Sequence, residues 1–315
     1  MKNLIFWGTS IFAVPCLRAL YELNELRPVL VITQPDRPKG RTQALEPSPV
    51  KIEAQKLGIS ILQPVQVKEI LGEIQKCAPE VMVLVSYGQF IPKECISFAP
   101  CGIVNVHPSL LPKYRGASPI QSAILQGSAE TGVSLMLLDE KLDHGPLIAQ
   151  ERILIKQEHD GITLSKELAM VAATLLSQKL PLYLAGQIQP VSQKHAEATY
   201  TARIRKEDGK LDFSKSAAAL SRSVRAYMGW PGTYAYLRNQ TGTFSKKCKI
   251  LAATAIPCSY FQKTYGALFS NSEKQLCAVT GEGCLHLTEL QIEGKKKISA
   301  EQFVAGYNPR NYRLL

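Results

Sequence analysis

The segment Gly102-Ile103-Val104-Asn105-Val106-His107 is followed directly by Pro108-Ser109-Leu110-Leu111-Pro112, and Asp143 comes 36 residues after the histidine. The first six residues form an apolar run typical of a buried strand, and the turn between two prolines ends it. Side chains two positions apart point to the same face of a strand, so Asn105 and His107 are predicted to lie together. An amide, an imidazole and a carboxylate can jointly hold and protonate the oxygen of a carbonyl under attack. The stretch therefore indicates acyl-type group transfer without a metal.

The rest of the first part alternates short β-rich runs with helical segments. Strands are predicted at residues 4–7, 29–33, 81–86, 103–106 and 133–138, and helices at residues 12–23, 50–57, 119–126 and 162–184. The last helix is expected to kink or end near Leu180, because Pro181 lacks a backbone N–H. Continuous apolar strands separated by helices indicate an α/β fold with a mostly parallel sheet covered on both faces. Since ligands of such sheets bind beyond the carboxyl ends of the strands, a site is expected on the loops at residues 8–11, 34–48, 86–91, 107–117 and 139–145.

The second part follows a polar stretch and has a different pattern. It contains one amphipathic helix, predicted at residues 216–227, and short alternating strands at residues 233–238, 247–252, 275–280 and 284–290. Several short strands separated by turns indicate a small β-barrel, with an oligonucleotide-binding type of barrel as one option. We therefore expect a first domain over residues 1–188, a linker over residues 189–205 and a second domain over residues 206–315.

Charge is distributed unevenly between the two parts. Residues 191–315 hold 19 Lys and Arg against nine Asp and Glu, a net charge of +10, whereas residues 1–190 hold 18 against 17, a net charge of +1. A nearly neutral module joined to a strongly basic one indicates a catalytic part and a docking part for a polyanion. A basic surface that serves only solubility is the alternative.

The composition is that of a soluble globular protein, with 45% hydrophobic and 20% charged residues over 315 positions. No apolar run approaches the roughly 20 residues of a membrane span, and the apolar part of the N-terminus is too short for a signal peptide. We expect a cytoplasmic protein without a membrane partner, and a monomer, since nothing requires an oligomer. The eight cysteines include no C-x-x-C pair, so reduced thiols are expected and a zinc site is not indicated.

Asn105, His107 and Asp143 have complementary roles in the predicted chemistry. A donor aimed at an oxygen that gains negative charge is worth roughly 2.7–4 kcal/mol. Histidine, with an ordinary pKa of about 6.5, exchanges protons near neutrality. Asp143 is expected to orient the imidazole, raise its proton affinity or accept a proton from an attacking amine through water. A serine nucleophile is not indicated, because the chain has no G-x-S-x-G motif and Ser109 lacks a local activation signature.

Two groups of cations lie outside this predicted centre. The loop at residues 34–43 carries Arg37, Lys39 and Arg41 among Gly and Pro, and is either a solvated surface loop or a mobile substrate clamp. The second group is expected to follow a phosphate backbone, or else to occupy solvated turns, and consists of Lys246, Lys247, Lys249, Lys295, Lys296 and Lys297.

The motifs of the first part resemble those of the formyltetrahydrofolate-dependent formyltransferases. They are N-V-H-P-S-L-L-P-K-Y-R-G at residues 105–116, P-I-Q at 119–121, E-T-G-V at 130–133 and L-D-x-G at 142–145. Three further stretches resemble the branch of that family that formylates methionyl-tRNA, namely Q-P-D-R-P-x-G-R at residues 34–41, P-S-P-V-K at 47–51 and G-W-P-G at 229–232. The resemblance runs nearly end to end. It implies a Rossmann-like first domain and a second domain similar to an oligonucleotide-binding barrel.

The resemblance also implies roles for individual residues. Asn105, His107 and Asp143 would be catalytic, with 10-formyltetrahydrofolate as the donor and initiator methionyl-tRNA as the acceptor of the formyl group. The tetrahydrofolate site would be lined by Ser109, Leu110, Leu111 and Pro112. The pterin would be held, chiefly through backbone groups, by Ser86, Tyr87, Gly88, Gln89, Phe90 and Ile91. Residues 36–43, with Arg41 prominent, would insert at the acceptor end of the tRNA, and His144 is not expected to be catalytic.

Several alternatives share part of this pattern. A sugar-nucleotide formyltransferase would use the same donor, but it would not need a net charge of +10 in the second part. A glycinamide ribonucleotide formyltransferase resembles only the first part. A folate hydrolase would use water in place of the amine, and a non-catalytic RNA-binding protein would not need the three polar residues intact.

Overall fold

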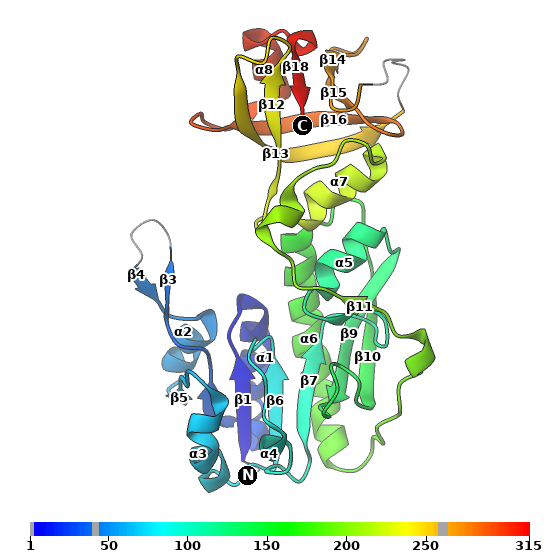
Figure 1. The fold of residues 1–315 in the computed structure, drawn as a ribbon. Helices are drawn as coiled ribbons and strands as arrows, with labels where there is room; N and C mark the ends of the chain where they lie inside the picture. Colours follow the sequence, from blue (N-terminus) through cyan, green and yellow to red (C-terminus); the bar gives the residue numbers. More distant parts are fainter. Residues whose placement is uncertain (1–2, 40–43, 258–263) are drawn as a thin grey trace. The chain divides into compact units, whose positions relative to one another are not determined.

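The computed structural model describes residues 3–39, 44–257 and 264–315, which divide into two compact units (Figure 1). The first unit comprises Met1–Pro119, Glu130–Leu154 and Ser165–Thr201, and the second comprises Ile120–Ala129, Ile155–Leu164 and Ala202–Leu315. The chain thus enters the second unit twice before it stays there.

A seven-stranded sheet forms the centre of the first unit, in the order β10-β9-β7-β6-β1-β2-β5. The strands are β1 (Leu4–Gly8), β2 (Pro28–Ile32), β5 (Ser60–Leu62), β6 (Val81–Val85), β7 (Ile103–His107), β9 (Glu130–Leu137) and β10 (Leu147–Leu154). The five strands from β7 to β5 are parallel, and β9 and β10 continue the sheet in antiparallel pairing. Every residue of β1 and of β7 is buried, so both faces of the sheet are covered. The predicted mostly parallel α/β sheet is confirmed.

The helices of the first unit are α1 (Val14–Glu22), α2 (Pro49–Lys56), α3 (Leu71–Lys76), α4 (Lys93–Ile96) and most of α6 (Gly161–Leu184), whereas α5 (Pro119–Gln126) lies almost wholly in the second unit. Helices α1, α2, α5 and α6 lie close to the predicted positions, and α3 and α4 were not predicted. Ser48 caps α2, since its hydroxyl accepts from the backbone N–H of Lys51 at 3.0 Å, and Pro49 opens the first turn. Helix α6 does not end at Leu180 but continues through Pro181 to Leu184.

Two short strand pairs lie in the loops of the described part of the first unit. A hairpin of β3 (Arg37–Lys39) and β4 (Ala44–Glu46) follows β2, and β8 (Arg115–Gly116) pairs in parallel with β11 (Tyr200–Thr201). The second pairing joins the segment after β7 to residues near the end of the unit.

The second unit is a small antiparallel barrel. Its strands are β12 (Thr233–Asn239), β13 (Ser245–Ile256), β14 (Leu268–Ser270), β15 (Leu276–Val279), β16 (Cys284–Ile292), β17 (Ile298–Ser299) and β18 (Tyr312–Leu314). The sheet runs in the order β14-β15-β16-β13-β12-β18, and its ends meet because the Leu314 N–H donates to the Gly266 carbonyl at 2.8 Å. Side chains alternate as a barrel requires, with Ala235 and Leu237 inside and Tyr236 and Arg238 outside. The predicted barrel is confirmed.

Helix α7 (Ala217–Ala226) explains why two earlier segments belong to the second unit. Its buried face carries Leu220 and Val224, as the periodicity predicted. From the same helix, Arg222 Nε donates to the Leu125 carbonyl at 2.9 Å and Arg225 Nη1 donates to the His159 carbonyl at 2.8 Å. These bonds anchor the segments of residues 120–129 and 155–164. Helix α8 (Ala300–Gly306) adds Phe303 to the barrel core.

The described residues also test the expectations on membrane spans and on cysteines. None of their helices combines the length and the apolar character needed to cross a bilayer. Cys16, Cys77, Cys95, Cys101, Cys248 and Cys277 are free thiols, whereas Cys284 is disulfide-bonded. The expectation of reduced thiols is therefore wrong for Cys284, since no C-x-x-C spacing or other short motif in the sequence marks it.

Candidate active site

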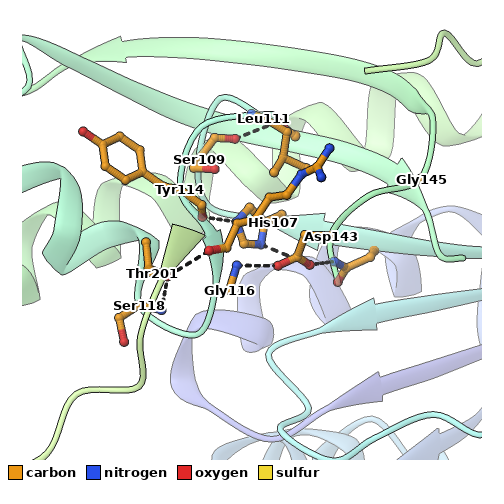
Figure 2. A network of polar contacts seen from close by, with 12 residues as sticks. His107, Ser109, Leu111, Tyr114, Gly116, Ser118, Asp143, Gly145 and Thr201 are labelled. Atoms are coloured by element: carbon orange, nitrogen blue, oxygen red, sulfur yellow. Dashed lines mark hydrogen bonds and ion pairs between the residues drawn. The ribbon is translucent and has the colours of Figure 1, made fainter. Parts of the chain in front are cut away.

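His107 and Asp143 lie together near the carboxyl end of β7 (Figure 2), and Asn105 of the same strand joins them. The carboxylate atom Oδ1 of Asp143 accepts from Asn105 Nδ2 at 3.3 Å and lies 3.7 Å from His107 Nδ1. All three residues are buried, with exposed fractions of 9%, 5% and 8%. The structure therefore brings together the three side chains that the sequence singled out, on a strand end and on the turn before β10.

Backbone groups fix the orientation of two of these side chains. The second carboxylate oxygen of Asp143 accepts from the Gly116 N–H at 2.7 Å, and His107 Nε2 lies 2.9 Å from the Tyr114 carbonyl (Figure 2). A carbonyl can only accept, so Nε2 is the protonated nitrogen and donates to it. Nδ1 is then the nitrogen that exchanges a proton, and it is the one that faces the carboxylate.

The loops that carry these groups hold strained backbone. Tyr114 and Asp143 have φ values of 60° and 46°, in the left-handed region that L-residues seldom adopt. Each such residue costs about 1–3 kcal/mol and persists only where surrounding contacts fix it. The glycine of the L-D-x-G motif has a packing reason, since a Cβ on Gly145 would lie 1.9 Å from the Leu137 carbonyl oxygen.

Several residues that support the site were missed by sequence reasoning. Gln193 is 5% exposed, and its amide nitrogen donates to the carbonyls of Asp143 at 3.0 Å and Gly145 at 2.7 Å. Its amide oxygen accepts from Arg115, which is 1% exposed. Gln193 lies in the polar stretch predicted as a linker, where neither periodicity nor a motif marks it. Arg115 lies in the motif of residues 105–116, but no role for its side chain was predicted from the sequence.

The predicted folate residues of the β7 loop lie beside the trio. Ser109 and Leu111 are buried, while Leu110 and Pro112 are half-buried. The Ser109 hydroxyl donates to the Lys113 carbonyl at 2.6 Å, and the Leu111 N–H donates to the Ser134 hydroxyl at 3.0 Å. These bonds shape the turn, and a role of its residues in folate binding stays a prediction.

The predicted pterin loop follows the neighbouring strand β6. Ser86, Gly88 and Phe90 are exposed, Gln89 is half-buried, and Tyr87 and Ile91 are buried. The Tyr87 carbonyl accepts from the Thr9 hydroxyl at 2.9 Å and from Gln34 Nε2 at 2.6 Å. Burial raises the pKa of the Tyr87 hydroxyl, so this ring is a neutral wall of the core. The loops after β1, β2 and β6 are thereby tied into one edge.

The basic hairpin after β2 has a rigid base. Asp36 accepts from Lys51 Nζ at 2.6 Å and from Gln63 Nε2 at 2.8 Å, and these partners, Gln63 first, lower the pKa of its carboxyl. Arg37 is exposed on β3, Lys39 lies in the same strand, and Arg41 lies outside the described residues. The tRNA contacts of these three cations stay a prediction.

The predicted cations of the second unit occupy two places. Lys247 and Lys249 flank buried Cys248 on β13 and therefore point outward, while Lys246 is exposed near the start of the strand. The Lys247 ammonium lies 3.5 Å from the centre of the Tyr234 ring. In the exposed turn after β16, which carries Lys295, Lys296 and Lys297, Lys297 is paired with Glu289 at 2.6 Å and Lys295 bonds the Tyr307 hydroxyl at 2.5 Å. Lys247 and Lys249 therefore carry their charge on the outer side of strand β13.

His144, next to Asp143, is not part of the trio. Its Nδ1 lies 2.7 Å from Asp139, and its ring stacks on His195 at a centroid distance of 3.9 Å. Partial desolvation, followed by the charges of His144 and Arg115, lowers the pKa of His195. Across residues 3–39, 44–257 and 264–315, no group of three or more His, Cys, Asp and Glu is placed to hold a metal ion.

Two family models match this chain. The formyl transferase model matches residues 1–180, and the model of the formyl transferase C-terminal domain matches residues 203–308. The chain belongs to the formyl transferase family. Within the family, a methionyl-tRNA formyltransferase from a Sulfurihydrogenibium species is 41% identical over 309 residues, which cover 97% of this chain and 97% of that protein. The methionyl-tRNA formyltransferase of Geobacillus thermodenitrificans is 39% identical and covers 98% of this chain over 96% of its own length.

Solved structures of formyltransferases share the fold. The sugar 3N-formyl transferase WlaRD aligns with a TM-score of 0.64 at 19% identity, over 94% of this chain and 99% of its own. An N-formyltransferase from Helicobacter canadensis, in complex with folinic acid and dTDP-3-aminofucose, aligns with a TM-score of 0.66 at 18% identity, over 91% of this chain and 99% of its own. At such identities the likeness extends to the fold alone.

Gly116 offers a test of how tightly the site loop is packed. A Cβ at Gly116 would lie 2.4 Å from the Thr201 carbonyl oxygen, whereas a Cβ at Gly186 would meet nothing within 4 Å, although both glycines have a positive φ. Gly186→Ala should destabilise the protein by roughly 1–2 kcal/mol. Gly116→Ala should add an overpacking cost of about 1–3 kcal/mol, measured by urea unfolding. Equal unfolding free energies for the two variants would contradict the packing described here.

Proposed function

We propose that this chain transfers the formyl group of 10-formyltetrahydrofolate to the α-amino group of methionine on initiator methionyl-tRNA. The observation that carries the proposal is the meeting of Asn105, His107 and Asp143 around one carboxylate oxygen. Relatives named methionyl-tRNA formyltransferase that match nearly the full chain support the choice of acceptor. The catalytic domain would extend to residue 188, and the tRNA-binding domain would begin at residue 206. The protein would act in the cytoplasm.

The residues at the edge of the sheet fit a folate donor. Exposed apolar side chains stand on the loops at the carboxyl ends of the parallel strands β1 and β6, with Ile11 68% and Phe90 82% exposed. A flat, partly apolar pteridine would cover such groups, and the turn of residues 109–112 would support the reacting end. 10-Formyltetrahydrofolate supplies an activated formyl group, so the protein need only bind, orient and move protons.

Asn105 and His107 act on the carbonyl oxygen of the formyl group. The Asn105 amide has two N–H donors, of which one is directed to Asp143, and its second donates to the oxygen that gains negative charge. His107 donates from Nδ1 when that nitrogen is protonated, because Nε2 is already bonded to Tyr114. The low exposure of both side chains strengthens these interactions by excluding water.

Asp143 organises the proton transfers. Its carboxylate lies 3.7 Å from Nδ1 of His107, close to the nitrogen through which a proton would pass. The transfer forms a bond between the amine nitrogen and the formyl carbon, and one proton moves from the amine to the departing nitrogen. Asp143 accepts this proton through water or returns it through His107.

The tRNA binds through phosphates, on the hairpin after β2 and on the basic barrel. Arg37 is exposed at the start of the hairpin, whose base is fixed by Asp36, Lys51 and Gln63. Lys247 and Lys249 offer charge from an ordered strand. A basic second part of net charge +10 has no comparable use with an amino-sugar nucleotide of a few charges.

The choice of acceptor is tested by offering three substrates with 10-formyltetrahydrofolate. We expect formylation of methionyl initiator tRNA, much slower formylation of methionyl elongator tRNA and none of an amino-sugar nucleotide. Products are counted as transferred labelled formyl groups. Preference for the amino-sugar nucleotide would overturn the assignment in favour of a sugar-nucleotide formyltransferase, and release of free formate in all three reactions would indicate a hydrolase.

The catalytic roles are tested by His107→Ala and Asp143→Ala. Each should lower the rate of formyl transfer by at least about 100-fold, since loss of one oxyanion donor alone costs 10²–10³. Affinity for the tRNA, measured by filter binding, should stay nearly unchanged because neither side chain lies among the basic groups. Unaltered turnover combined with weaker tRNA binding would contradict both roles.

The electrostatic role of β13 is tested by replacing Lys247 and Lys249 together with Gln. The tRNA affinity should fall, and the slope of log affinity against log salt should decrease by about 0.7–0.9 for each lost phosphate contact. The control replaces Lys56 and Lys76, which are exposed on helices of the first unit, with Gln. It removes the same charge and should leave the slope of log affinity against log salt as it is in the wild-type protein. If the two double variants show the same dependence of tRNA affinity on salt, β13 is not part of the tRNA interface.

A further inference from the structure

The stretch between α6 and the second unit makes close contacts with both loops of the site. We call residues 191–201 the strap. At its start, Val191 and Leu147 exchange two backbone hydrogen bonds of 2.8 Å, which fix the strap beside the turn that carries Asp143. At its end, Tyr200 and Thr201 of β11 pair with β8, which carries Gly116. The strap therefore spans from one side of the carboxylate to the other.

Gln193 connects the two loops through a single side-chain amide. Its nitrogen donates to the Asp143 and Gly145 carbonyls, and its oxygen accepts from Arg115 Nε at 3.2 Å and Nη2 at 2.6 Å. Both donors and both acceptor positions of the amide are used, in a side chain that is almost fully buried.

Arg115 is the second half of this connection. Besides Gln193, its Nη2 lies 2.9 Å from His195 Nδ1, and its Nη1 donates to the Tyr200 hydroxyl at 3.4 Å. None of the ion pairs found among the described residues includes Arg115. Its buried guanidinium is thus directed to neutral acceptors of the strap, which orders the strap rather than neutralising a carboxylate.

The strap also holds the segment that bonds His107. The Tyr114 N–H donates to the Thr199 hydroxyl at 2.8 Å, while the Tyr114 carbonyl accepts from His107. The hydroxyl of Thr201 donates to the Arg115 carbonyl and accepts from the Ser118 N–H, both at 3.1 Å (Figure 2). The left-handed residues Tyr114 and Asp143 are each bonded to the strap, which supplies the contacts that their backbone conformations require.

We propose that Gln193 is a positioning residue of the formyl transfer, which acts through Asp143 and is itself held by Arg115. The inference rests on the proposed function. Gln193 fixes the carbonyl of Asp143 and thereby aims its carboxylate at Asn105 and His107. Its amide is fully bonded within the protein and its side chain is buried, so its removal should affect the rate of the reaction and not the binding of either partner.

The test uses Gln193→Met in the full chain, which keeps the length of the side chain and removes its hydrogen bonds. The kcat should fall by about 100-fold, the loss expected from a displacement of about 1 Å at a reacting group, with KM for the donor and for the tRNA unchanged. Gln189→Ala is the matched control, since Gln189 is exposed and bonds only the nearby Gly186 carbonyl at 3.3 Å. A rise in KM without a change in kcat would overturn the proposal.

A second measurement separates positioning from a general loss of structure. In an Asp143→Asn background, Gln193→Met should lower the single-turnover rate by less than about twofold, because groups that act as a unit are not additive. A loss that multiplies fully with that of Asp143→Asn would mean that Gln193 does not act through the carboxylate.

If the wild-type protein formylates none of the three acceptors, the proposed function is wrong. Hydrogen exchange still tests the positioning role of Gln193 in that case, because it requires no turnover. The Gly116 N–H is bonded to the Asp143 carboxylate, so its exchange should become at least about tenfold faster in Gln193→Met and in Gln193→Glu, while the amides of β1 and β6 keep their protection. Unchanged protection of Gly116, or equal loss of protection throughout the sheet, would contradict a positioning role.

Discussion

The carboxylate of Asp143 is the point on which the geometry of the site depends. Its two oxygens receive the Asn105 amide and the Gly116 N–H, and the same group faces His107 at 3.7 Å. One small anion thus sets the relative positions of a strand end, a turn and a loop that are separated along the chain. Any change that moves this carboxylate alters the amide, the imidazole and the loop together, which is why its own backbone needs such extensive support.

That support combines strain with many weak bonds. Left-handed backbone at Asp143 and Tyr114 is unfavourable locally, and it is maintained by hydrogen bonds to Gln193 and Thr199. Because each bond contributes only about 0.5–1.5 kcal/mol, no single one secures the arrangement. The close approach of Gly116 to Thr201 completes it by leaving no room for a Cβ. A rigid site results from several modest contacts whose geometries agree.

The sequence predicts the parts of this structure that depend on local pattern. Apolar runs located β1, β6 and β7 within one residue at each end, and the alternation in the second part located β12 and β16. The spacing of Asn105 and His107 on a strand placed both side chains on one face, as observed. Gln193 could not be found in this way, because its role comes from carbonyls 48 and 50 residues away and its neighbours have no periodicity. The inclusion of residues 120–129 and 155–164 in the second unit likewise depends on bonds from α7 that no local pattern reports.

The division of charge along the chain separates attraction from chemistry. Asn105, His107 and Asp143 are buried and lie within residues 1–190, which carry a net charge of +1, whereas the net charge of +10 belongs to residues 191–315. At ordinary salt concentrations, interactions between exposed charges that lie more than about 8–10 Å apart are largely screened. Buried pairs are screened much less. A polyanionic acceptor would therefore be captured by a salt-sensitive surface and then react at a centre that salt hardly affects.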